Sequence, residues 1–368
     1  MLVGGLLLSG CSDWLDIFPK NEQVTNNYWK SKEDVEAVVT SGYYYMRETT
    51  PYLISWGELR GGSIYAYSAA EETKMQDFQL LPSSSLCKWE TFYQVINMAN
   101  SVIHYAPGVV GVDETYTEAA MKSHQTEAYF MRAWCYFTLV RNFREVPLVM
   151  EPYVDDSAPY SIPKSSEEEI IAQIKTDLTI AIGSNAAKEF FDNANWNASK
   201  GRITKWALYA FMTDVCLWAG DYDECIKYAD LLIHATASKR PVFMSIPEQW
   251  FSIFNPGNSN ESIFEMNWDA SNYNQTSKNP ASFFKLSTTA EYQYSPTMLE
   301  RLREDLYNVP LAKDYVRSQF GAYVLVSSEG SDTPSACIWK YLGGEVRDFT
   351  VTRTKDDANF IIYRMADV

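Results

Sequence analysis

Hydrophobic and polar positions recur most clearly with helical spacing between residues 201 and 234. The first half of this segment is apolar on most faces, which is typical of a buried helix. Gly220 interrupts the pattern, as a glycine just past a helix end does. In the second half the apolar positions follow the i, i+3, i+4, i+7 rule, and Asp221 and Glu224 are predicted to cap it. The segment therefore predicts two antiparallel helices joined by a tight turn, similar to a tetratricopeptide unit.

The same periodicity predicts further helices earlier in the chain. Ser31 and Asp34 are predicted to cap one helix, and Ser165 and Glu168 are predicted to cap another. Two more helical patterns cover residues 85–105 and 117–143. Because a helix hairpin cannot bury its apolar faces alone, we expect these helices to pack as repeats, mainly over residues 31–235.

The pattern changes after Pro241. The region from about 241 to 358 contains few helical signals and many Asn and aromatic residues. Its predicted elements are short strands at 262–268, 323–328 and 336–341 and a helix at 295–308. Residues 56–79 are polar and contain glycine, and they are predicted to form a long loop. The prediction is a mostly α fold of tetratricopeptide-like helix hairpins with a loop-rich, partly β ligand-binding region.

The last ten residues, 359–368, begin a further apolar helical pattern that has no cap or breaker. A half hairpin leaves an apolar helix face uncovered, which is unfavourable in water. We therefore expect a truncated last repeat and a natural protein that continues beyond Val368.

Composition and charge narrow the classes of partner. The chain has 368 residues, of which 46% are hydrophobic, enough for a sizeable core. Its formal net charge is −16, which argues against nucleic acid as a partner. No apolar run reaches the roughly 20 residues that a membrane-spanning helix needs. Aromatic residues make up 15% of the chain, and Tyr and Trp serve well on binding surfaces.

A short apolar run at the N-terminus ends at Cys11 in the sequence LSGC. This run resembles the lipobox of bacterial lipoproteins, although the usual basic start of a signal peptide is missing. We predict that residues 1–11 are a lipoprotein signal with its lipobox and that Cys11 carries the lipid. The alternative is a chance cysteine after an apolar start. The other five cysteines have no paired spacing and predict no disulfide framework.

Signals of catalysis are poor. The three histidines, His104, His124 and His234, lie far apart in the sequence and outside any metal-binding motif. The chain contains no nucleophile elbow, phosphate-binding loop or dinucleotide fingerprint. We therefore predict a protein that is not an enzyme and that needs no metal or cofactor.

Signals of ligand binding are better and lie in two loop regions. Aromatic rings can stack on the apolar faces of sugars, while Asn, Glu and Arg bind the hydroxyl groups. The candidate ligand-binding residues are Trp56, Glu58, Arg60, Tyr65 and Tyr67 in the first region and Trp268, Asn272, Tyr273, Tyr292 and Tyr294 in the second. The alternative is that each ring packs between loops and helices. The helical spacing of Trp89, Trp134, Trp206 and Trp218 predicts core positions.

Several segments together resemble one family, the SusD/RagB outer-membrane lipoproteins of the Bacteroidetes. They are CSDWLDIFPKNEQVTNNYWKSKEDVEAVVTSGYYYM, WETFYQVINMANSVI, EAYFMRAWCYFTLVRNFREVPLV, GRITKWALYAFMTDVCLWAGDY and YRMADV, in the family's order. The chain departs from the family at Arg144–Glu145, where Gly-Asp is usual, so we expect a different turn there. It also lacks the C-terminal helices expected of the family.

The resemblance implies a SusD-like domain over residues 12–368 with an α-α superhelix. It implies a lipid-anchored protein on the surface of the outer membrane that binds a nutrient, usually a glycan. It also implies that the protein delivers oligosaccharide to a SusC-like TonB-dependent transporter. A different hypothesis is a tetratricopeptide-type scaffold that binds proteins or peptides. The sequence does not identify the glycan.

Overall fold

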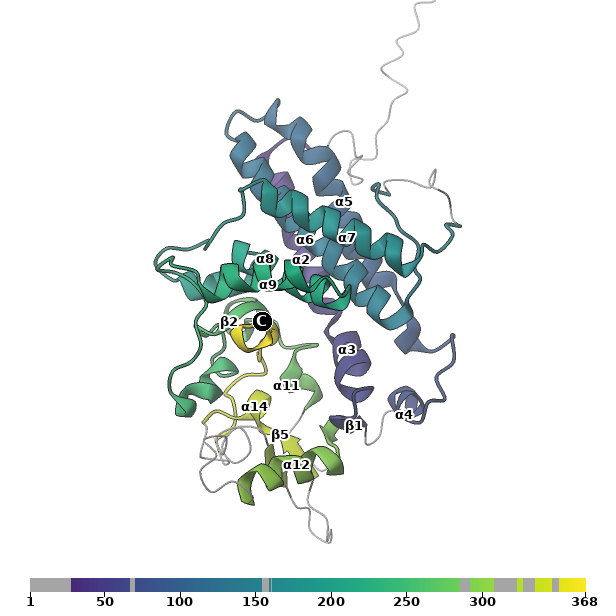
Figure 1. Cartoon of the computed structure of the whole chain (residues 1–368), viewed down its shortest axis with the longest axis vertical. Coiled ribbons are helices and arrows are strands. Elements are labelled where there is room, and N and C mark those ends of the chain that lie inside the picture. The colour runs from purple at the N-terminus through teal and green to yellow at the C-terminus, as the bar shows by residue number, and fades with distance from the viewer. Residues whose placement is uncertain are drawn as a thin grey trace, which may run out of the picture.

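Helices dominate the fold, and the strands form small two-stranded sheets. The computed structural model describes residues 28–66, 70–153, 159, 161–284, 292–307, 323–326, 335–345 and 351–368. In Figure 1 the long helices lie together at one end, α8 and α9 run across the middle, and the short strands and helices lie at the other end. The predicted mostly α fold with helix hairpins and a partly β region is confirmed.

Four long helices pack in succession, α2 against α5, α5 against α6 and α6 against α7. Their bounds are Lys32–Glu48 for α2, Glu90–Val110 for α5, Glu118–Phe143 for α6 and Glu167–Gly183 for α7. The predicted capping box of Ser31 and Asp34 is confirmed. The other capping box lies one residue later than predicted, at Ser166 and Glu169, because Ser166 directly precedes the first helical turn.

The predicted hairpin consists of α8 (Lys205–Trp218) and α9 (Tyr222–Ile233), which pack against each other. Gly220 between them has φ of +73°, a conformation that glycine adopts without strain. Asp221 is the N-cap residue of α9 as predicted, but its side chain makes no capping hydrogen bond and instead accepts one from Lys175 Nζ at 3.0 Å. The apolar residues on the outer face of α9 are exposed, among them Tyr222, Ile226 and Ile233.

The prediction of a long loop at 56–79 is wrong. Ile54, Trp56 and Leu59 are buried on a turn of π-helix, although the glycines and polar residues nearby obscure this pattern in the sequence. The elements of this region are α3 (Thr50–Leu53), the π-helical η2 (Ile54–Leu59), β1 (Ile64–Ala66), α4 (Ala70–Gln76) and the 3₁₀ turn η3 (Ser85–Cys87).

The later region combines short helices with antiparallel strand pairs β1–β3, β2–β6 and β4–β5. Its helical elements are η5 (Pro247–Ile253), α10 (Ala270–Tyr273), α11 (Pro280–Phe283), α12 (Pro296–Tyr307), α14 (Trp339–Leu342) and η7 (Met365–Asp367), while the 3₁₀ turn η4 (Trp196–Gly201) precedes α8. Its strands are β2 (Ser262–Met266), β3 (Tyr292–Tyr294), β4 (Tyr323–Val326), β5 (Ser335–Ile338) and β6 (Phe360–Arg364). The predicted strand near residue 262 and helix near residue 295 are confirmed.

The helix predicted to begin at residue 359 is wrong, because Phe360–Arg364 forms strand β6. The aromatic and β-branched residues of this segment suit a strand once β2 supplies the partner edge. Local periodicity cannot reveal that partner, which lies about a hundred residues earlier in the chain.

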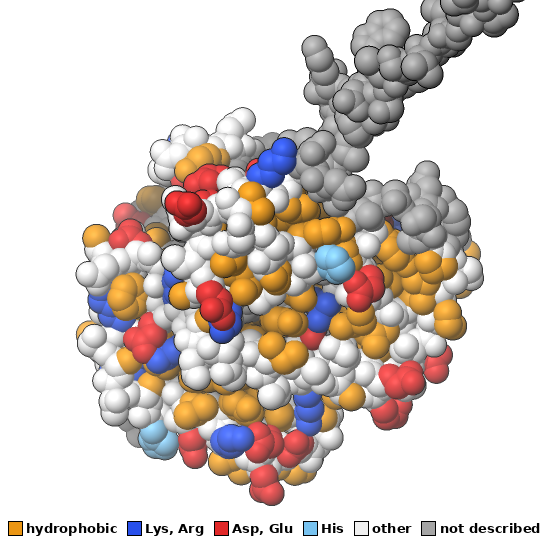
Figure 2. Space-filling view, turned by 90° about the horizontal axis from the view of Figure 1, so that it is seen from above, with side chains coloured by type: hydrophobic (Ala, Val, Ile, Leu, Met, Phe, Trp, Pro, Cys, Tyr) orange, Lys and Arg blue, Asp and Glu red, His pale blue; other side chains and the backbone are white. Residues whose placement is uncertain are grey.

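The core is centred on α6, which is buried over most of its length. No helix in the described ranges is long and apolar enough to cross a membrane. On the face seen in Figure 2, acidic and basic side chains are interspersed among hydrophobic ones. On that face, therefore, the excess negative charge of the chain is not gathered into one acidic patch.

Candidate functional site

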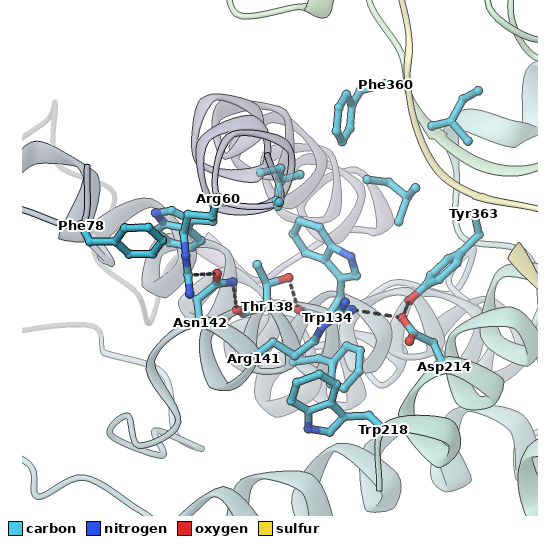
Figure 3. A pocket seen from close by; sticks show the side chains of 17 residues that line it. Arg60, Phe78, Trp134, Thr138, Arg141, Asn142, Asp214, Trp218, Phe360 and Tyr363 are labelled. Carbon is cyan, nitrogen blue, oxygen red and sulfur yellow. Dashed lines mark hydrogen bonds and ion pairs between the residues drawn. The ribbon is translucent and has the colours of Figure 1, made fainter. Parts of the chain in front are cut away.

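A cavity of about 570 Å³ lies where η2, α6, α8 and β6 meet (Figure 3). Seven aromatic side chains and several polar groups line it. The lining residues are Leu53, Trp56, Gly57, Arg60, Gly61, Phe78, Trp134, Phe137, Thr138, Arg141, Asn142, Asp214, Trp218, Phe360, Ile361, Ile362 and Tyr363. The volume is within the range of ordinary small-molecule sites.

One face of α6 supplies five of these side chains. Trp134, Phe137, Thr138, Arg141 and Asn142 follow the i, i+3, i+4, i+7, i+8 spacing, which places them on one side of a helix. Trp134 and Phe137 are buried, whereas Arg141 is exposed. One face of α6 therefore forms both the buried aromatic part of the lining and its exposed polar edge.

The Trp218 ring lies at the end of α8 and is 46% exposed, so its predicted core position is wrong. Trp218 continues the apolar helical pattern of α8, but the described elements leave this end of the helix partly uncovered. The Arg141 guanidinium lies 4.9 Å from the Phe137 ring centroid and 5.3 Å from that of Trp218. Such contacts favour a fixed arginine position. Trp218 Nε1 also donates to Glu167 Oε1 at 3.0 Å.

Asp214 joins two sides of the cavity. Its Oδ2 accepts a hydrogen bond from the Tyr363 hydroxyl at 2.8 Å and lies 3.4 Å from Arg141 Nη1. Burial, followed by the charge of Asp214, raises the pKa of Tyr363 well above its usual value. The hydroxyl therefore stays protonated and donates to the carboxylate at neutral pH.

Arg60 follows the π-helical turn and extends to α6 on the opposite side of the cavity. Its Nη1 donates to Asn142 Oδ1 at 2.9 Å, and Asn142 Nδ2 donates to Thr138 O at 2.8 Å. The amide of Asn142 is thereby oriented from both ends (Figure 3). Such fixed amide and guanidinium groups can bind hydroxyl groups with little loss of side-chain entropy.

Phe78 is the most exposed ring of the lining, at 94%. It has φ of +58° and ends α4, where Gln79 N donates to Lys74 O at 2.7 Å and Phe78 N donates to Met75 O at 3.1 Å. This is a helix-ending motif in which glycine is usual. A bulky exposed ring in this strained position is a candidate contact for a ligand.

Two of the sequence-predicted site residues, Trp56 and Arg60, line this cavity. Trp56 is fixed in the packed interior, where its Nε1 donates to Leu86 O at 2.8 Å. Its ring also stacks on Phe92 with centroids 5.2 Å apart. Trp134 and Trp206 are buried as predicted, and Trp89 is half-buried.

The structure brings together three other predicted residues, Tyr65, Tyr292 and Tyr294, because β1 pairs with β3. The Tyr65 hydroxyl donates to Gln293 Oε1 at 3.3 Å, while Tyr292 and Tyr294 are buried. Glu58 and Tyr294 line a small cavity of about 20 Å³. These residues thus form a cluster between η2 and the later region of the chain.

The last group of predicted residues lies around α10. Trp268 is buried and its Nε1 donates to Ser277 O at 3.0 Å. Asn272 is exposed and bonds to Asp269. Tyr273 is 73% exposed and lines a separate cavity. Tyr67 and Cys11 lie outside the described residues. The assignment to ligand binding of the ten candidate residues from the sequence analysis stays a prediction.

Sequence reasoning missed much of this lining, including Phe78, Asn142, Asp214, Trp218 and Tyr363. One available signal was the group Thr138, Arg141 and Asn142, which places polar side chains on one face of the otherwise apolar last part of α6, from Ala133 onward. The other lining residues come from distant segments that meet only in the fold. Among the described residues, no group of three His, Cys, Asp or Glu side chains is placed to hold a metal ion.

A SusD-like family model, described as starch-binding associating with outer membrane, matches residues 13–217. SusD-like protein P38 of Formosa agariphila is 25% identical over 254 residues, which are 67% of this chain and 46% of that protein. The chain spans about half the length of the curated relatives it matches.

Two solved structures illustrate the shared fold. A laminarin-binding SusD-like protein has a TM-score of 0.69 and 18% identity, covering 92% of this chain and 79% of its own. A structure with xylogluco-oligosaccharide has a TM-score of 0.64 and 22% identity, covering 90% of this chain and 69% of its own. The family match covers more than half of the chain and confirms the resemblance found in the sequence. The chain belongs to the SusD-like family, which is described as starch-binding and associating with the outer membrane.

Proposed function

We propose that the cavity in Figure 3 binds an oligosaccharide. The observation that carries this proposal is the lining itself, in which α6 presents aromatic rings and polar groups on one face. A sugar has apolar C–H faces and a rim of hydroxyl groups. Aromatic rings such as Phe78 and Trp218 suit the faces. Arg60, Asn142 and Asp214 suit the hydroxyl groups.

The comparisons support a carbohydrate as the ligand class. The family description refers to starch, and two proteins of similar fold have laminarin and xylogluco-oligosaccharide as ligands. We propose that Trp56 and Arg60, from the ten predicted residues, contribute to this cavity. Trp56 forms part of its floor and Arg60 part of its rim.

The polar groups of the lining favour binding over hydrolysis. Asp214 is the one carboxylate among the described residues that line the cavity, and Tyr363 and Arg141 already engage it. Most glycoside hydrolases use a pair of carboxyl groups that flank the scissile bond. We therefore propose a capture protein that holds its ligand without cleaving it.

Membership in the SusD-like family also supports a proposal about where the protein is located and which protein it works with. We propose that lipid on Cys11 anchors the protein at the surface of the outer membrane. There it would deliver oligosaccharide to a SusC-like TonB-dependent transporter. Replacement of Cys11 by Ala should release the protein from the membrane fraction of its native host, and unchanged fractionation would contradict lipidation.

The binding proposal is tested with two matched phenylalanines. Phe78 is 94% exposed in the cavity, whereas Phe243 is 57% exposed and is not a lining residue. Calorimetry with soluble laminari-, xylogluco- and malto-oligosaccharides should identify a ligand of the unaltered protein. Phe78→Ala should weaken its binding about tenfold, the equivalent of about 1.4 kcal/mol, and Phe243→Ala should leave it unchanged. Equal affinities for the two variants would contradict the site.

One observation favours the alternative function of a protein- or peptide-binding scaffold. The outer face of α9 exposes Tyr222, Ile226 and Ile233, and exposed apolar patches often mark protein contacts. If this alternative holds, Ile226→Asp should abolish peptide binding in a peptide-array assay without affecting any oligosaccharide affinity. Binding of no peptide, together with oligosaccharide binding that depends on Phe78, would reject it.

A further inference from the structure

A second cavity, of about 560 Å³, lies between the C-terminal half of α2 and strand β2. Its described lining is Thr40, Tyr43, Tyr44, Met46, Arg47, Gly201, Phe264, Glu265, Met266, Asn267, Tyr273 and Gln275, none of which lines the first cavity. We propose that it is a second carbohydrate site, which takes one or two neutral sugar residues. This inference rests on the proposed carbohydrate-binding function.

Two tyrosine rings stand at the rim of this cavity. Tyr44 on α2 is 50% exposed and Tyr273 on α10 is 73% exposed. The Arg47 guanidinium lies 5.8 Å from the Tyr44 ring centroid. Large exposed rings contributed by two separate elements to one cavity are suited to stacking on the C–H faces of a sugar.

The polar groups deeper in the cavity are held in place and incompletely satisfied. Arg47 Nη1 donates to Asn267 O at 3.0 Å and also to Gln275 Oε1. Asn267 Nδ2 donates to Asn258 Oδ1 at 3.2 Å, whereas the buried Asn267 Oδ1 has no hydrogen-bond partner among the described residues. That oxygen is closed to solvent, so the polar group of this set that can meet a sugar hydroxyl is the fixed Arg47 guanidinium.

The charges of the lining favour a neutral ligand. Arg47 and Glu265 both belong to the lining, but the side chain of Glu265 is fully buried. Glu265 accepts hydrogen bonds from Asn258 N at 3.0 Å and from Asn359 Nδ2 at 2.8 Å, so it is already engaged. Arg47 is likewise engaged, by Asn267 O and Gln275 Oε1, so a neutral sugar can bind without placing a further charge in the cavity.

The two cavities can be distinguished with methionine methyl signals. Met46 and Met266 line the second cavity, and no methionine is among the described residues that line the first. In protein labelled with ¹³C at the methionine methyl groups, the same oligosaccharides should shift the Met46 and Met266 signals. Tyr44→Ala and Tyr273→Ala should each weaken this titration about tenfold. Tyr222→Ala should not, since this tyrosine lies outside both cavities and its exposure, 64%, is between those of Tyr44 and Tyr273.

Phe78→Ala separates this inference from the proposed function. The Met46 and Met266 titration should keep its Kd in Phe78→Ala, while the calorimetric signal of the first cavity weakens. Signals that stay unmoved up to about 10 mM of every oligosaccharide would overturn the second site. Calorimetric binding that still depends on Phe78 would then leave the first site standing. Methionine shifts that are lost in Tyr44→Ala and Tyr273→Ala would support the second site. If Phe78→Ala also left the calorimetric affinity unchanged, the first site would be rejected.

Discussion

At the scale of single residues, Arg144 shows how a departure from the family pattern is accommodated. It follows α6 with φ of +64° and ψ of −61°, and Glu145 N donates to Phe143 O at 2.8 Å. These values describe a γ-turn with a positive φ, which is rare and strained for a residue with a side chain. The resemblance to the family implies glycine at this position, and glycine adopts this conformation more readily. In this chain the turn is tight, and Arg144 occupies its strained position.

We predict that Arg144→Gly raises the free energy of unfolding by about 1 kcal/mol, because relief of strain outweighs the extra flexibility of glycine in the unfolded chain. Urea unfolding monitored by circular dichroism measures the change. Arg144→Ala is the control. It removes the exposed ion pair with Glu167 but retains the Cβ atom, and therefore the backbone strain. The control should lie within about 0.5 kcal/mol of the original protein. A glycine variant no more stable than the alanine variant would refute the strain.

At the scale of elements, one buried ion pair holds three helices together. Arg132 on α6 donates to Asp177 on α7 through Nε at 2.8 Å and through Nη2 at 2.7 Å. Its Nη1 donates to Asn100 Oδ1 on α5 at 2.9 Å. Both charged side chains are nearly inaccessible to water. Removal of one partner would leave the other charged and buried between the helices.

We predict that Asp177→Ala lowers the free energy of unfolding by about 3–5 kcal/mol, because an unpaired buried charge is far more costly than a lost surface contact. The matched variant is Glu224→Ala, which breaks an exposed ion pair with Lys227 on α9. That change should cost no more than about 1 kcal/mol. Denaturant unfolding of the two variants compares them directly. Similar losses would show that the buried pair has no special role in packing.

Sequence reasoning succeeded for elements that are specified locally and failed where distant segments meet. Ser31 and Asp34 are three residues apart, and their capping box was predictable. Strand β6 was not, because its strand character depends on pairing with β2. The exposure of Trp218 depends on how the end of α8 is covered, which helical spacing cannot show.

The same limit applies to the candidate site. The five lining residues of α6 share one helical face, and their pattern is present in the sequence. Phe78, Asp214 and Tyr363 come from three other segments and join that face only in the fold. Composition drew attention to aromatic residues such as Tyr273 and Tyr292, but it could not show that the Tyr273 ring is exposed and the Tyr292 ring is packed.

At the scale of the whole molecule, a pair of buried charges lies where the helical repeats meet the loop-rich region. Lys200 on η4 is 3% exposed, and its Nζ lies 4.4 Å from the Trp196 ring centroid. Glu265 on the adjacent strand β2 is fully buried. Burial lowers the pKa of Lys200 to about 7, and the charge of Glu265 opposes that shift only in part. The junction between the two regions therefore contains a lysine that loses its proton near neutral pH.

This pKa gives the stability of the whole fold a defined pH dependence. The ordinary pKa of lysine is 10.5, so between about pH 7 and 10.5 the unfolded chain holds a proton that folded Lys200 has released. Stability rises with pH wherever the unfolded state binds more protons, so the cost of burying this charge is complete below pH 7 and fades as the pH approaches 10.5. Lys200→Met should remove that cost, and its stabilising effect should be on the order of 4 kcal/mol larger at pH 6 than near pH 10. Urea unfolding at a series of pH values measures this difference, and Lys30→Met at an exposed lysine is the control. A stability difference between Lys200→Met and the original protein that stays constant over this range would show that Lys200 keeps its proton in the folded state.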